Sequence, residues 1–147
     1  MSASDPTRPR APLLAEAGAA LLAGSAARLL IPFPRLAGRL AKHTASLPAS
    51  PVEVETIRRA IDAWTRRLPL APKCFARGLA AFAMLKRRGY ATQLYYGAAT
   101  IDGKLKAHVW VRSGDQDVVG CDIADQYALL ATFPEDRPAR SRQRRLS

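Results

Sequence analysis

The chain has 147 residues, of which 48% are hydrophobic, as expected for one globular domain with a modest core. Its net charge of +11 directs attention to acidic partners or surfaces. Two cysteines, Cys74 and Cys121, are too few for a disulfide scaffold. Residues 1–10 lack the basic start and apolar run of a signal peptide, so we expect a cytoplasmic protein with reduced thiols.

Composition divides the chain into three regions. Residues 1–10 are polar and contain prolines, and residues 134–147 carry five arginines, so both ends are predicted to be disordered. Residues 11–133 are predicted to form a single domain.

Residues 12–31 are rich in alanine and leucine and are predicted to form one helix or a hairpin of two short helices. Glu16 and Arg28 leave too few uncharged residues to span a bilayer, so no integral membrane segment is expected. Residues 35–42 are predicted to form a short basic amphipathic turn. We favour a solvated helix face there over a contact with a membrane surface or an acidic peptide.

The next helix has a clear start at Ser50. Ser50 is suited to cap the helix, Pro51 to its first position and Glu53 to the capping-box position. A core-facing stripe then follows with helical spacing at Val54, Ile57, Ile61 and Trp64. Arginines lie off this stripe at positions 58, 59, 66 and 67.

Cys74 is predicted to open a further helix. Pro69 and Pro72 keep the approach extended, because the residue before a proline avoids the helical region. Unpaired backbone N–H groups at a helix start carry partial positive charge, which stabilises a thiolate. The helix is predicted to end at Gly89, and its apolar stripe comprises Phe75, Leu79, Phe82, Met84 and Leu85.

After this helix the hydrophobic period changes to two, which predicts an antiparallel meander. Strands are expected over 91–100, 104–112 and 117–122, with turns at Asp102-Gly103 and at 113–116. Alternation along the second strand places His108 and Trp110 on one face. The apolar segment 127–133 is expected to be a short helix or a packed edge.

A cysteine, a histidine and an acid in this order form a workable catalytic arrangement. A Cys74 thiolate attacks a carbonyl, His108 holds the ion pair and protonates the leaving group, and a carboxylate fixes the tautomer of the ring. Hairpin geometry favours Asp122 as that acid over Asp117 and Asp125. We therefore expect Asp122→Asn to be clearly impaired and the other two Asp→Asn variants to be less affected.

Residues 72–111 resemble the transglutaminase-like cysteine proteases, specifically the lasso peptide biosynthesis B2 proteins, and the resemblance covers most of residues 12–133. The resemblance rests on Lys73-Cys74-Phe75-Ala76-Arg77, on Ala107-His108-Val109-Trp110-Val111 and on Val118-Val119-Gly120-Cys121-Asp122. It implies an α+β fold: a transglutaminase-like or papain-like core with N-terminal helices, a cysteine-bearing helix and an antiparallel β-meander.

The resemblance also implies a function. These proteins remove the leader from a ribosomally made lasso peptide precursor. A separate leader-binding protein (B1, a RiPP recognition element) delivers the precursor, and an ATP-dependent macrocyclase closes the ring. The expected catalytic residues are Cys74, His108 and Asp122, with Arg77 and Trp110 binding substrate, and no cofactor or metal is expected. The backbone N–H of Cys74 is a natural oxyanion donor.

Two other functions fit the same residues. The triad could transfer the acyl group to an amine, as a transglutaminase does, instead of to water. In another class, the chain could be a non-enzymatic basic module for nucleic acid or an anionic membrane. Against nucleic acid, the aromatic residues form no evident exposed platform between basic ones, so we expect no nucleic acid partner.

Overall fold

The computed structural model describes residues 5–30, 35, 39, 47–67 and 74–134. Its helices precede an antiparallel sheet, so the predicted α+β class is confirmed. In chain order the elements are α1 (Ala11–Leu30), α3 (Pro51–Arg67), α4 (Cys74–Arg87), β1 (Gln93–Ile101), β2 (Lys104–Ser113), β3 (Gln116–Val119), the short 3₁₀ helix η1 (Cys121–Gln126) and β4 (Ala128–Phe133).

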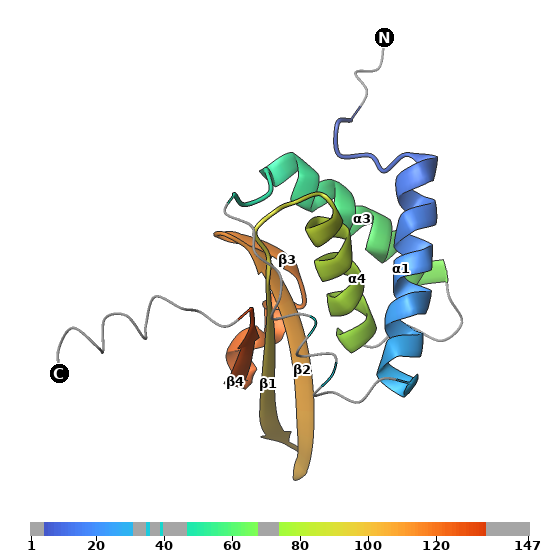
Figure 1. The fold of residues 1–147 in the computed structure, drawn as a ribbon. Helices are drawn as coiled ribbons and strands as arrows, with labels where there is room; N and C mark the ends of the chain where they lie inside the picture. The colour runs from blue at the N-terminus through green and yellow to red at the C-terminus, as the bar shows by residue number, and fades with distance from the viewer. Residues whose placement is uncertain (1–4, 31–34, 36–38, 40–46, 68–73, 135–147) are drawn as a thin grey trace, which may run out of the picture.

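The molecule has a helical layer against one face of a four-stranded sheet (Figure 1). The strand order is β3-β2-β1-β4, with all neighbours antiparallel. Helix α4 packs on β2 on one side and on α1 on the other, and α3 contacts both α1 and β3. The cysteine-bearing helix therefore lies at the centre of the fold, directly against the strand that carries His108.

Helix α1 is one continuous helix and not a hairpin of two. Its Ala17 and Leu21 are buried in the core. Glu16 makes a two-pronged ion pair with Arg88, at 2.9 and 2.6 Å, and the hydrogen bonds from Arg88 lower the pKa of Glu16. This pair fastens α1 to the end of α4. Among the described residues, no helix has the length and apolar character needed to cross a membrane.

One hydrogen bond caps the start of α3, and another joins α3 to α1. The capping prediction at Ser50 is confirmed, because its Oγ accepts a hydrogen bond from the Glu53 N–H at 3.3 Å. Trp64 packs against the core, as expected, and its Nε1 donates to the Leu14 carbonyl at 2.6 Å, which joins α3 to α1. Arg35 and Arg39 are exposed, but the remainder of the predicted basic turn lies outside the described residues.

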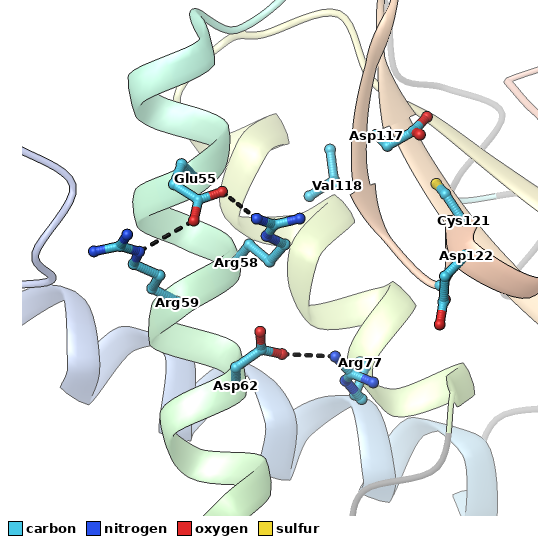
Figure 2. Close-up of a pocket in the computed structure, with 10 residues that line it drawn as sticks. Glu55, Arg58, Arg59, Asp62, Arg77, Asp117, Val118, Cys121 and Asp122 are labelled. Atoms are coloured by element: carbon cyan, nitrogen blue, oxygen red, sulfur yellow. Dashed lines mark hydrogen bonds and ion pairs between the residues drawn. The ribbon is translucent and has the colours of Figure 1, made fainter.

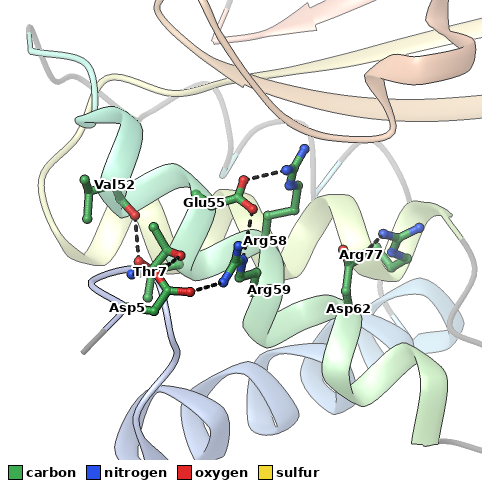
Figure 3. Close-up of polar contacts among 9 residues, drawn as sticks. Asp5, Thr7, Val52, Glu55, Arg58, Arg59, Asp62 and Arg77 are labelled. Carbon is green, nitrogen blue, oxygen red and sulfur yellow. Dashed lines mark hydrogen bonds and ion pairs between the residues drawn. The ribbon is translucent and has the colours of Figure 1, made fainter. Parts of the chain in front are cut away.

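Asp5 ties the segment before α1 to α3 (Figure 3). Its carboxylate accepts hydrogen bonds from Thr7 and, at 2.7 Å, from Arg59. These bonds, chiefly the one from the Thr7 hydroxyl, lower the pKa of Asp5 to about 2. Of the ends predicted to be disordered, residues 1–4 and 135–147 lie outside the described residues.

The β1–β2 hairpin has its turn where the sequence predicted it, with Asp102 (φ 52°) and Gly103 (φ 76°) in the turn. The third strand is shorter than predicted, because the chain turns at Gly120 (φ 73°) and continues as η1. The predicted strand over 117–122 is therefore wrong at its end. The apolar segment after η1 is the edge strand β4, paired with β1.

Helix α4 approaches β2 closely at Gly78, and we expect Gly78→Ala to destabilise the protein. A Cβ there would lie 2.6 Å from Cγ1 of Val109, a buried side chain with little rotational freedom. Overpacking of this kind costs about 1–3 kcal/mol. Urea denaturation measures the free energy of unfolding, which should fall. Gly→Ala in a helix usually raises this free energy by about 0.5–1 kcal/mol.

Ala83 provides the control for this prediction, because it is exposed on the same helix. Ala83→Gly should cost about 1 kcal/mol from helix propensity alone. A stabilised Gly78→Ala variant would mean that α4 moves away from β2 without cost.

Candidate active site

Cys74, the first residue of α4, lines a cavity of about 220 Å³. The cavity lies where α4, β2 and the β3–η1 connection meet. Its other lining residues are Arg77, His108, Val109, Val119, Gly120, Asp122 and Ile123. The structure thus brings together Cys74, His108, Asp122 and Arg77, four of the five predicted site residues. Among the described residues, no hydrogen bond joins Cys74 to any of the others.

His108 is 5% exposed and held by a backbone group. Its Nε2 lies 2.7 Å from the carbonyl oxygen of Gly120. A carbonyl only accepts hydrogen bonds, so the proton of the neutral ring is on Nε2 and Nδ1 is left as the acceptor. Fixing the tautomer in this way prepares Nδ1 to accept a proton, which is the function of a general base.

Gly120 performs two tasks that require glycine. Its φ of 73° ends β3 in the left-handed region, and a Cβ there would lie 2.6 Å from the Val109 carbonyl oxygen and 3.2 Å from Nε2 of His108. Sequence reasoning missed this residue as a partner of His108. The available signal was a glycine between a short apolar strand and the polar segment Cys121–Gln126.

Asp122 lines the cavity but does not bond to the histidine. Continuing the Val111–Val119 register for three more residues would place Asp122 opposite His108, as hairpin geometry predicted. The turn at Gly120 takes the chain out of that register, so Asp122 lies in η1, exposed. Within the described part of the chain, its carboxylate has no hydrogen bond or ion pair.

The two other candidate acids lie elsewhere. Asp117, on β3, forms an ion pair at 2.9 Å with Arg112, its neighbour on β2. Asp125 is exposed in η1 and is not part of the cavity wall. Of the three candidate acids, Asp122 alone lines the cavity that contains Cys74 and His108.

Aromatic rings pack on His108. Trp110 stacks on it with ring centroids 5.9 Å apart, as expected from their shared face of β2, and Tyr127 stacks at 4.9 Å. Trp110 is only 7% exposed, stacks also on Tyr95, and does not line the cavity. The structure thus places Trp110 as support for the imidazole. Tyr127, which follows η1, was not singled out from the sequence.

A family model described as the transglutaminase-like superfamily matches residues 19–132, which is most of the chain. The chain belongs to the transglutaminase-like superfamily. The resemblance seen in the sequence is thus confirmed at this level. Neither a curated protein nor a solved structure matches the chain. Members of the transglutaminase-like superfamily are typically enzymes, either cysteine proteases or acyltransferases. The cavity that contains both Cys74 and His108 is therefore the candidate active site of this chain.

The second thiol of this transglutaminase-like chain lies in a different environment. Cys121 donates weak hydrogen bonds to the carbonyls of Val111 and Val119, at 3.4 and 3.5 Å. Burial, followed by the charge of Asp117, raises its pKa to about 11. Cys121 is therefore protonated at neutral pH, and a protonated thiol is a poor nucleophile.

We expect iodoacetamide to modify Cys74 at least tenfold faster than Cys121 at pH 7. Cys121→Ala and Cys74→Ala each leave one thiol, so mass spectrometry of the two variants gives the separate rates. The Cys121 rate should rise about tenfold per pH unit up to about pH 11, because its thiolate fraction rises in that proportion. Equal alkylation rates of the two thiols at pH 7 would contradict the expectation that Cys74 is the more reactive one.

Proposed function

We propose that the chain is a cysteine peptidase that removes the leader from a ribosomally made lasso peptide precursor, with Cys74 as nucleophile and His108 as base. The observation that carries this proposal is one cavity containing a cysteine at a helix start and a histidine held in one tautomer by the Gly120 carbonyl, at 2.7 Å. Superfamily membership supports cysteine acyl chemistry. The resemblance to lasso peptide B2 proteins supports the choice of substrate.

The reaction proceeds in two halves. Nδ1 of His108 takes the thiol proton, and Sγ of Cys74 attacks the scissile carbonyl carbon. The Cys74 N–H donates to the oxyanion, and its collapse breaks the C–N bond as His108 protonates the departing amine. Water, deprotonated by His108, then hydrolyses the thioester, which releases the leader as a carboxylic acid and restores the thiol.

In this mechanism the Gly120 carbonyl performs the orienting task of the carboxylate in a triad. A neutral acceptor fixes the tautomer of the ring but stabilises an imidazolium less than a carboxylate does. Burial and stacking against Trp110 and Tyr127 further restrict the motion of the His108 ring.

Mass spectrometry of the precursor incubated with the chain and a leader-binding protein tests the proposal. We expect free leader with a C-terminal carboxylate. A leader joined to an added amine would instead indicate acyl transfer through the same thioester. With Cys74→Ala in place of the wild type, neither product should form.

Delivery of the precursor is a separate part of the proposal. The chain alone should cleave poorly, and the leader-binding partner should raise the rate mainly at low substrate, because it makes the encounter effectively intramolecular. Arg66 and Arg67, exposed at the end of α3, are candidate docking residues for an acidic partner, whereas Arg58 and Arg59 already pair with Glu55.

Steady-state kinetics with and without the partner, at several salt concentrations, measure this effect. Equal rates in both conditions would show that the chain recognises its precursor unaided. Salt-sensitive binding of nucleic acid or anionic vesicles, independent of Cys74 and without cleavage, would favour the basic module.

A further inference from the structure

A second cavity, of about 440 Å³, has the lining drawn in Figure 2 and shares part of it with the cavity that contains Cys74. Helices α3 and α4 form one wall, and β3 with η1 forms the other. Arg77, Gly120 and Asp122 line both cavities. A groove therefore leads from the nucleophile along the space between the helices and the sheet edge.

Most charges along this groove neutralise one another. Glu55 pairs with both Arg58 and Arg59 (Figure 3). Asp62 accepts a hydrogen bond from Nη2 of Arg77 at 2.7 Å. The carboxylate of Asp117 forms an ion pair with Arg112. The groove is thus polar without a strong excess of either charge, which does not suit a highly charged ligand such as a phosphate.

Two groups at the junction of the cavities retain hydrogen-bonding capacity. The Arg77 side chain is 30% exposed, and within the described residues only its Nη2 makes a hydrogen bond, so Nη1 remains a donor. Asp122 is exposed, and within the described part of the chain its carboxylate has no hydrogen bond or ion pair. The two residues lie on opposite sides of the cavity, one on α4 and one on η1 (Figure 2).

A donor facing an acceptor complements a peptide unit, which presents one C=O and one N–H. We infer that Arg77 and Asp122 bind a backbone peptide unit of the substrate beside the scissile bond, and that the groove beyond them holds the flanking extended segment. The inference rests on the proposed peptidase function. It makes Asp122 a substrate-binding residue and leaves the orientation of His108 to Gly120.

The first experiment measures binding without turnover. Fluorescein-labelled unstructured peptides are screened by anisotropy against Cys74→Ala, and the tightest binder is resynthesised with each backbone amide N-methylated in turn. N-methylation at one position should weaken binding to Cys74→Ala about tenfold, because it removes the N–H that donates to Asp122. The same methylation should have no effect on the Cys74→Ala/Asp122→Ala double variant, in which that acceptor is already absent. Additive losses at every position would overturn the inference.

The second experiment separates binding from orientation. With a cleaved peptide, Asp122→Ala should raise KM about tenfold. Asp122→Asn, which keeps an acceptor oxygen, should lose less, in contrast to the clear impairment expected from the sequence for an orienting acid. Neither should move the pH profile of Cys74 alkylation. A large fall in kcat for Asp122→Asn with a displaced profile would overturn the inference and make Asp122 the orienting acid.

Asp125→Ala is the matched control, because Asp125 is exposed on the same short helix and lines neither cavity. Its KM and alkylation profile should equal those of the wild type. If the wild-type chain cleaves no peptide but the N-methylation experiment gives the expected result, the peptidase proposal fails and the inference about peptide binding stands.

Discussion

Replacing Cys74 by alanine is expected to abolish leader removal while the protein stays folded. The substitution removes the proposed nucleophile, and losing one member of a catalytic unit lowers kcat by a factor on the order of 10⁴–10⁶. The half-buried thiol makes no hydrogen bond within the described residues, so its loss should cost little stability. Mass spectrometry of the products measures cleavage, and circular dichroism measures the fold.

Cys121→Ala is the matched control for this variant. Its thiol is protonated at neutral pH and packed at the start of η1, so cleavage should remain within a few-fold of the wild type. If Cys74→Ala retained activity and Cys121→Ala lost it, the nucleophile would have been assigned to the wrong thiol.

His108→Ala is expected to cost about as much activity as Cys74→Ala, because nucleophile and base act as a unit. The ring is buried, hydrogen-bonded through Nε2, and stacked on Trp110 and Tyr127, so its Nδ1 is the candidate base of the cavity. Single-turnover cleavage measures the loss. A fall of less than tenfold would show that the histidine is not the base.

His108→Gln distinguishes a chemical role from a structural one. Glutamine keeps an N–H that can donate to the Gly120 carbonyl, but it cannot take a proton at neutral pH. We expect a folded and inactive protein, with slower alkylation of Cys74. Trp110→Phe, which keeps a ring beside His108, should lose far less activity.

The features that the sequence predicted well depend on local signals. The Ser50 cap, the apolar stripe of α3, and the Asp102-Gly103 turn are each encoded within a few residues, and each agrees with the structure. Period-two alternation along β2 correctly placed His108 and Trp110 together. The cysteine at a helix start was predicted for the same reason.

The features that the sequence did not predict depend on contacts between distant segments. The register that pointed from His108 to Asp122 holds at Val111 and Val119, but one left-handed residue redirects the chain before it reaches the histidine. A glycine is compatible with a bulge or a strand end, and only the packing against Val109 and His108 decides between them. Pairing of β4 with β1 likewise cannot be read from an apolar run alone.

The β1–β2 hairpin has a practical consequence for immobilising the protein. Its turn projects beyond the helices (Figure 1), and among the described residues no atom outside the neighbours of Gly103 in the chain lies within 4 Å of a Cβ built on that residue. At about 3.3 Å per residue, the turn is about 17 Å along β2 from His108. Loop-closure entropy grows slowly with length, so we expect the turn to tolerate an inserted affinity tag, which would attach the molecule to a sensor surface at a point distant from His108.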